Sequence, residues 1–157
     1  MADEAARSYK RVAGKIRMLV FPTRSQAHVM NSLIRPSVCQ PVNLAEKFAA
    51  LKDSWMPRVV AELNDYQFKI VRLQGEFIWH AHATTDEAFI VITGELRIEL
   101  RDRHVALRAG ELFVVPRGVE HRTCADREVE LMLIEPRGVP NTGSAGGART
   151  APNDVWA

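Results

Sequence analysis

The chain has 157 residues, with 21 Lys and Arg against 19 Asp and Glu, and this composition predicts one globular domain. No apolar run approaches the roughly eighteen residues of a membrane-spanning helix, and the start Met-Ala-Asp-Glu lacks the pattern of a signal peptide. The two cysteines, Cys39 and Cys124, form no CxxC pair, which is typical of reduced thiols. We therefore expect a cytoplasmic protein with no membrane partner.

Charge is distributed unevenly along the chain. Residues 1–40 carry seven Lys and Arg against Asp3 and Glu4, a balance of +5, whereas the remainder carries 14 basic and 17 acidic groups, a balance of −3. The basic segment is compatible with a nucleic-acid contact, a targeting segment or a solvated extension. It lacks interleaved aromatic residues, so a nucleic-acid role is disfavoured, and we predict a basic N-terminal extension over residues 1–40. Met18 and Met30 leave the natural start of translation open.

The next segments predict a short helix followed by many short strands. Asn43-Leu-Ala-Glu46 resembles a capping box, and it predicts a helix that runs to about Lys52 and is stopped before Pro57. Alternating apolar patterns between Gly, Asn and Asp turn signals then predict strands over 59–63, 66–73, 77–82, 87–93, 95–100, 104–108, 112–115, 121–124 and 129–135. This pattern is typical of an all-β protein, here a small antiparallel barrel or jelly roll. The glycine-rich residues 141–157 are predicted to be a flexible C-terminal tail.

Strand parity separates the expected core from the expected surface. Leu96, Ile98, Leu100, Val105 and Leu107 alternate with polar residues and should face the core, whereas His104 should face solvent. In the neighbouring strands both faces are apolar: Ile78 and Phe89 are expected to point inward, and the outward set is Phe77, Trp79, Ala88, Ile90 and Ile92. Such an outer face needs a cover, and a second subunit is the favoured one over the N-terminal extension. We therefore predict a homodimer.

Four residues form a candidate metal site: His80, His82, Glu87 and His121. Residues i and i+2 of a strand share a face, so His80 and His82 should point the same way. Glu87 opens the following predicted strand, and His121 opens a later one. Imidazole nitrogen and carboxylate oxygen are donors for divalent transition metals, and four such ligands would leave two octahedral positions open.

The spacing around these residues resembles the two motifs of the cupin superfamily. The first is Gly75, His80-x-His82, Glu87 and Gly94, and the second is Gly110, Pro116-x-Gly118 and His121. Two departures are that four residues rather than the usual five separate Gly75 from His80, and that Ala125 stands where Asn is usual. The resemblance covers residues 41–140. This part of the chain is similar to the small single-domain bacterial cupins labelled phosphomannose-isomerase-like. The resemblance implies a metal-binding cupin barrel that dimerises.

The resemblance implies a bound divalent metal, for which Fe, Mn, Ni, Zn, Co and Cu all stay open. Cupins include isomerases, epimerases, dioxygenases, decarboxylases and lyases, so the first hypothesis is a metalloenzyme acting on a small oxygenated metabolite such as a sugar, keto acid or phenol. The second is a noncatalytic module that binds or senses a small ligand. Candidates for a general base or anion clamp, each also compatible with an exposed position, are Tyr66, Gln67, Lys69, Arg72, Glu76, Arg117 and Arg122.

Overall fold

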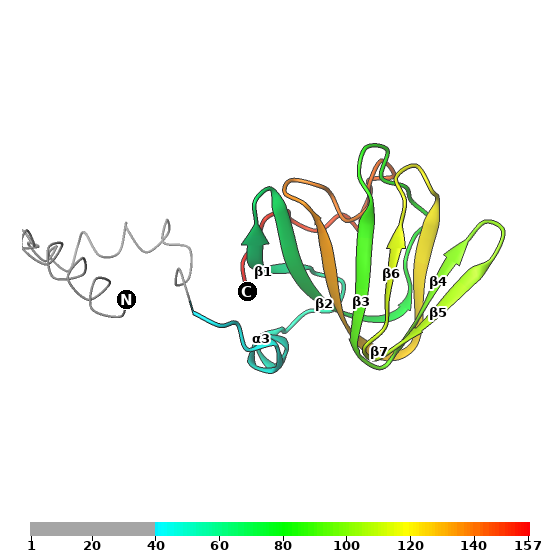
Figure 1. Cartoon of the computed structure of the whole chain (residues 1–157). Helices are drawn as coiled ribbons and strands as arrows, with labels where there is room; N and C mark the ends of the chain where they lie inside the picture. The colour runs from blue at the N-terminus through cyan, green and yellow to red at the C-terminus, as the bar shows by residue number, and fades with distance from the viewer. Residues whose placement is uncertain (1–39) are drawn as a thin grey trace, which may run out of the picture. The chain divides into compact units, whose positions relative to one another are not determined.

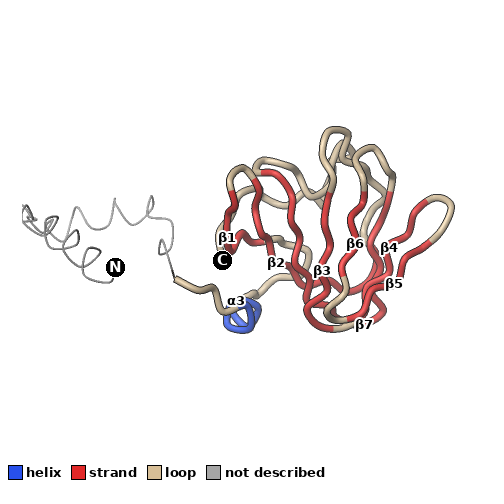
Figure 2. Tube along the Cα trace, viewed as in Figure 1, coloured by secondary structure: helices blue, strands red, loops and turns tan. Residues whose placement is uncertain are grey.

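The computed structural model describes residues 40–157, and Pro41–Ala157 form one compact unit (Figure 1). The extension predicted for residues 1–40 lies outside the described residues, apart from Gln40. Along the chain the unit contains α3 (Leu44–Ala50), β1 (Arg58–Leu63), β2 (Tyr66–Glu76), β3 (Glu87–Thr93), β4 (Glu95–Leu100), β5 (His104–Arg108), β6 (Leu112–Val115) and β7 (His121–Pro136). One short helix therefore accompanies an otherwise all-β unit, as predicted (Figure 2).

The strands form an antiparallel sandwich, with β7 shared between two groups of strands. The second half of β7 lies between β2 and β3, which extend the order to β1-β2-β7-β3-β6. Its first half pairs with β4, and β4 pairs with β5. Because β1, β5 and β6 each pair with a single neighbour, the sheet has open edges. The predicted all-β jelly-roll fold is confirmed, and its sheet is not closed into a barrel.

Most predicted strands are found at their expected positions, with two differences. The expected strand over 77–82 does not form, and its only ladder contact is an isolated bridge between His80 and His121. The expected strands over 121–124 and 129–135 are one strand, β7. The turn signal at Asp126 marks a bulge within that strand: Leu73 pairs with Val129 and Gly75 with Ala125, so residues 126–128 face a single residue of β2.

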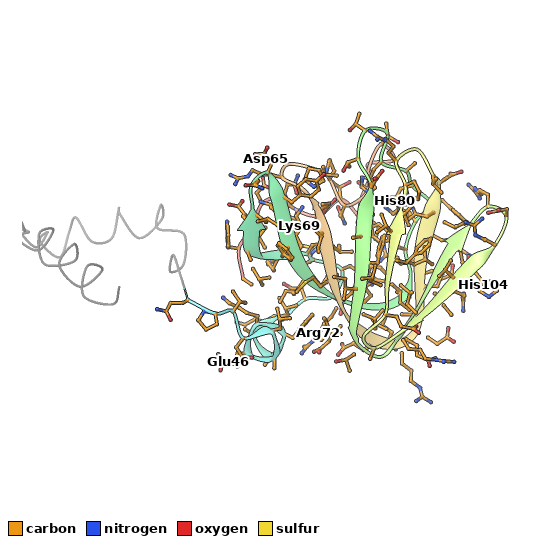
Figure 3. All side chains as sticks on the ribbon, viewed as in Figure 1. Glu46, Asp65, Lys69, Arg72, His80 and His104 are labelled. Carbon is orange, nitrogen blue, oxygen red and sulfur yellow. The ribbon has the colours of Figure 1, made fainter. Side chains whose placement is uncertain are left out.

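The core between the strands follows the predicted parity. Leu96, Ile98, Leu100 and Leu107 are buried and Val105 packs against them, whereas His104 is exposed on the hairpin of β4 and β5 (Figure 3). The alternation also holds along β3, where Glu87, Phe89 and Val91 are buried and the residues between them are partly exposed. This regular alternation places Glu87 on the inner face of the sandwich.

The helix covers part of the outer face of β2. Asn43 caps α3, since its side-chain oxygen accepts a hydrogen bond from the amide of Glu46 at 3.3 Å, and its amide donates to the Glu46 carboxylate at 2.9 Å. Phe48 is 1% exposed and packs with Val60 and Ile70. The predicted helix is therefore present, and it ends at Ala50, two residues before the expected end.

Residues 141–157, expected to form a flexible tail, lie against the sandwich. Trp156 forms a bridge with Val59 beside β1, and the Ala157 amide donates to the Val59 carbonyl at 3.0 Å. Thr142 is fully buried, and its hydroxyl lies 2.8 Å from that of Thr150. The segment is thus part of the compact unit. Across residues 40–157, no helix is long and apolar enough to cross a membrane.

Candidate metal centre

The fold brings His80, His82, Glu87 and His121 together from three segments. The two histidines at 80 and 82 lie in the connection from β2 to β3, Glu87 is the first residue of β3, and His121 is the first residue of β7. The backbones of His80 and His121 exchange two hydrogen bonds, of 3.0 and 2.9 Å. One donor atom from each of the four side chains lies within 4.8 Å of the others, and all four residues are buried.

Two of the rings are oriented by backbone carbonyls. His80 Nδ1 lies 3.1 Å from the Ile78 oxygen, and His121 Nδ1 lies 3.0 Å from the Val119 oxygen. Because a carbonyl can only accept, each Nδ1 donates, and in the neutral ring Nε2 carries the lone pair. Metal-binding histidines commonly donate such a hydrogen bond from the ring nitrogen that does not bind the metal.

The donor atoms lack hydrogen-bond partners, which is the observation that tests whether a metal ion fits. Nε2 of His82 and of His121 lie 3.2 and 3.3 Å from the same carboxylate oxygen of Glu87. All three atoms are buried without a hydrogen bond. Buried polar atoms normally have a partner, so three converging ones leave a large unmet demand. A divalent cation at this point would satisfy it, and nitrogen and carboxylate oxygen are ligands of the right chemistry.

The ionisation of the group also suits a cation. Burial is the main cause and the neighbouring His121 the second cause that lowers the pKa of His80 to about 4, so this ring is neutral near pH 7. Burial raises the pKa of Glu87, but its contacts with His121 and His82 outweigh burial and bring it down to about 2. Burial lowers the pKa of His82, and contact with Glu87 outweighs this and raises it. Glu87 therefore contributes a negative charge.

Neighbouring backbone holds the paired histidines in place. The His82 carbonyl accepts from the Gly118 amide at 2.8 Å, and the Ala81 carbonyl accepts from the Ser144 amide at 3.2 Å. Gly143 has a φ of +50° and faces Ala81 so closely that a Cβ atom there would overlap the Ala81 carbonyl oxygen. The C-terminal segment and the Pro116-x-Gly118 corner thus support the two histidines from different sides.

A cavity opens on one side of the four residues. His80, Glu87 and Thr123 line it, and so do Trp55 and Asn141. Its empty volume of about 370 Å³ includes space that is open to solvent. A small molecule in this cavity would therefore reach the donor group from its open side.

The expected alternation of inward and outward side chains is broken just before His80. As a result, a different side chain from the expected one lines the cavity. Phe77 lines the cavity and Ile78 does not, the reverse of the prediction. The Phe77 amide donates to Thr123 and the His80 amide to His121, so three steps along one segment match two along the other. The extra residue places Phe77 and His80 on the same side. Trp79 lies elsewhere, with the Arg101 guanidinium 3.9 Å from its ring centre.

None of the seven candidate acid–base or anion-binding residues lines this cavity. Arg72 pairs with Glu130 at 3.2 Å, and Arg122 pairs with Glu76 at 2.7 Å. Tyr66 and Arg117 are exposed. Cys124 is buried, but it lines surface hollows beside Arg97, so it stays outside the ligand group.

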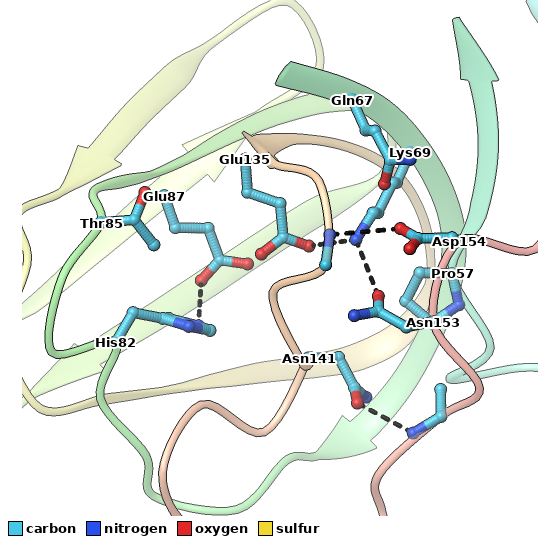
Figure 4. A network of polar contacts seen from close by, with 12 residues as sticks. Pro57, Gln67, Lys69, His82, Thr85, Glu87, Glu135, Asn141, Asn153 and Asp154 are labelled. Carbon is cyan, nitrogen blue, oxygen red and sulfur yellow. Dashed lines mark hydrogen bonds and ion pairs between the residues drawn. The ribbon is translucent and has the colours of Figure 1, made fainter. Parts of the chain in front are cut away.

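The remaining two candidates, Lys69 and Gln67, are buried on the inner side of β2 rather than exposed. Lys69 Nζ donates to Glu135 at 2.9 Å and to Asn153 at 3.3 Å. Figure 4 shows Glu135 between Lys69 and Glu87. Burial and then the charge of Glu87 raise the pKa of Glu135 to about 7, although Lys69 lowers it. Glu135 was missed in the sequence analysis. It lies two and four residues after the buried Leu133 and Leu131 on β7, and this spacing was the signal that its side chain faces the interior.

Comparisons with known proteins agree with this geometry. A cupin domain family matches residues 69–135. A cupin-2 domain protein of known structure from Shewanella frigidimarina is 53% identical, covering 61% of this chain and 94% of that chain, with a TM-score of 0.61. A protein structure from Neisseria meningitidis is 32% identical, covering 62% and 99%, with a TM-score of 0.57. An uncharacterized protein, YdbB, from Bacillus subtilis is 40% identical over 87 residues, or 48% of this chain and 77% of its own length.

Proposed function

The chain belongs to the cupin superfamily, and from this premise we propose that it is a metalloenzyme that acts on a small oxygenated metabolite at the four-residue centre. The observation that carries the proposal is the set of three buried, unpartnered donor atoms on His82, Glu87 and His121, with His80 beside them. A divalent transition metal held by these residues would act as a Lewis acid or oxygen activator. The isomerase and dioxygenase classes are both compatible with this proposal.

The chain's own residues would position the substrate and limit water. Val71, Leu131 and Leu133 line the cavity, and their apolar side chains strengthen electrostatic interactions at its inner end by excluding water. Thr123 is 5% exposed and places a hydroxyl-bearing side chain in the same wall. The carbonyls of Ile78 and Val119 keep His80 and His121 in one orientation.

Metal analysis of the purified protein tests the proposal. We expect His80→Ala, His82→Ala, Glu87→Ala and His121→Ala each to lower metal occupancy. The loss of affinity should exceed the roughly ten- to hundredfold that the loss of a ligand's hydrogen-bond partner costs, since each variant removes a ligand itself. His104→Ala is the matched control because His104 is exposed on the distant hairpin. Equal occupancy in all five variants would exclude these four ligands. The same measurement identifies the metal among Fe, Mn, Ni, Zn, Co and Cu.

A noncatalytic binding or sensing module would use the same cavity. Turnover distinguishes the two functions: the enzyme proposal expects the metal-loaded protein to convert a molecule that perturbs the spectrum of its metal, and the Glu87→Ala variant to lose that conversion. Molecules that bind but are returned unchanged would instead support the binding module.

A further inference from the structure

The residues that line the cavity restrict which substrates fit, in addition to any bound metal. The cavity's aromatic side chains form a connected series from Trp55 to the donor group. Trp55 stacks on Phe77 with ring centres 5.2 Å apart and an interplanar angle of 13°. Phe77 in turn meets His80 edge to face at 5.4 Å, and Phe89 meets His121 in the same way at 5.8 Å. Flat rings therefore line the cavity from Trp55 inward.

The position of Trp55 is held by an unusual backbone conformation. Its φ is +65°, a region that costs a residue with a side chain roughly 1–3 kcal/mol and that clusters at ligand sites. The Trp55 amide donates to the Arg72 carbonyl at 2.9 Å, which holds this conformation. A turn at this position would not by itself require a large side chain, and glycine would adopt the same φ without strain. The chain nevertheless has a tryptophan ring here, and this ring lines the cavity.

Among residues 40–157 no cationic side chain lines the cavity, so a bound metal would be the counter-charge available to an anion there. None of its lining residues is Lys or Arg, and its one ionised group outside the histidines is Glu87. The cations near it are engaged elsewhere: Lys69 is buried against Glu135, and the Arg149 guanidinium lies over the Trp55 ring at 5.4 Å without lining the cavity. A phosphate placed among Val71, Leu73 and the leucines of β7 would lose its hydration without a partner.

A polyhydroxylated ligand meets a related difficulty. Apart from His80 and Glu87, the polar side chains in the wall are Thr123 and Asn141. Half of the hydrogen-bonding capacity of Asn141 is already used, since its oxygen accepts from the Ala151 amide at 2.9 Å and its amide donates to the Arg149 carbonyl at 3.1 Å. Several hydroxyl groups of a sugar would therefore be buried without hydrogen bonds, at a cost of about 1–3 kcal/mol each.

We propose that this site takes a small, uncharged, planar molecule with a phenolic or enolic oxygen at one end. The oxygen would lie toward His80 and Glu87, and the flat apolar body would lie against Phe77 and Trp55. This inference rests on the proposed metal centre and narrows its substrate class from the sugar, keto acid and phenol group to the last of these. It makes Trp55 a specificity-determining residue.

Binding of matched probes to the metal-loaded protein tests the inference by calorimetry. Catechol and myo-inositol both carry neighbouring oxygens on a six-membered ring, and they differ in whether the rest of the ring is apolar and flat. We expect catechol to bind at least tenfold more tightly than myo-inositol or mannose 6-phosphate. Metal content is measured after each titration, so that removal of the ion by catechol is not counted as binding.

Two tryptophan variants test whether the preference for catechol arises from the residues that line the cavity. Trp55→Leu should keep its metal and weaken catechol binding by roughly three- to tenfold, the usual worth of an aromatic contact. Trp79→Leu is the matched control, because Trp79 lies under Arg101 and does not line the cavity. Equal or tighter binding of myo-inositol or mannose 6-phosphate by metal-loaded protein would overturn the inference, as would unchanged catechol binding in Trp55→Leu. Absence of metal from the wild-type protein would instead overturn the proposed metal centre.

Discussion

At the scale of single residues, Gly143 connects the C-terminal segment to the paired histidines. A methyl group there would overlap the Ala81 carbonyl, whereas Gly146, also at positive φ, has open space around it. We expect Gly143→Ala to reduce both thermal stability and metal content, and Gly146→Ala to cost only the roughly 1–2 kcal/mol of a left-handed conformation. Metal analysis and thermal denaturation of the two variants provide the check. Equal effects would show that Ala81 moves aside without consequence for its neighbours.

Glu135 predicts a pH dependence of stability in the metal-free protein. Burial raises its pKa to about 7 from an ordinary value of 4.5, so the folded state binds this proton more tightly than the unfolded state. The stabilising contribution is therefore fully present below pH 4.5 and is lost as the pH rises through about 7. Relative to Glu135→Gln, the wild type should lose on the order of 2 kcal/mol across this range.

Denaturant unfolding of the two proteins at several pH values measures this difference. Glutamine keeps the size of the side chain without titrating, so the difference between the two proteins reports the titration of Glu135 together with its coupling to Glu87. A difference that stays constant between pH 4.5 and 8 would mean that Lys69 keeps Glu135 ionised throughout.

At the scale of elements, the C-terminal segment acts as a strap across β1 and β2. Asn153 contacts Lys69, and the residues at 155 and 157 exchange backbone hydrogen bonds with Val59. We therefore expect deletion of residues 144–157 to lower the melting temperature and metal content, because it also removes the Ser144 contact to Ala81. A flexible tail, which the sequence predicted for residues 141–157, would instead be removable without such losses. Circular dichroism melting and metal analysis of the shortened chain decide between the two outcomes.

At the scale of the whole molecule, an apolar surface lies on the outer side of β3 and β6. Leu112 is 63% exposed and Val114 is 44% exposed, and they are the cross-strand partners of Ile90 and Ala88. We predict a homodimer through this surface, as large exposed apolar groups favour. Trp79, which the sequence assigned to the same surface, packs under Arg101 beside β4 instead and is no longer expected to contribute.

Light scattering at micromolar concentration tests the dimer. Leu112→Glu should shift the protein toward monomer, since burying an unpaired charge costs several kcal/mol. Leu63→Glu is the control: Leu63 is 60% exposed and ends β1, at the opposite edge of the strand order. A wild-type monomer would contradict the prediction, and so would equal behaviour of the two variants.

The sequence alone determined most of the strands and the candidate donor set. Alternation along β3 and β4 and the glycines at the turns are local signals, because side-chain direction in a paired strand has a period of two. The same local spacing selected His80, His82, Glu87 and His121, which the structure brings within 4.8 Å of one another.

Only the tertiary structure decided which other groups share the interior. One extra residue before His80 reverses the parity of Phe77, and a pairing register cannot be read from one strand alone. The burial of Lys69 depends on Glu135, 66 residues further along the chain, and the strap depends on contacts with Val59. These features arise from contacts between distant segments, whose partners a local pattern does not specify.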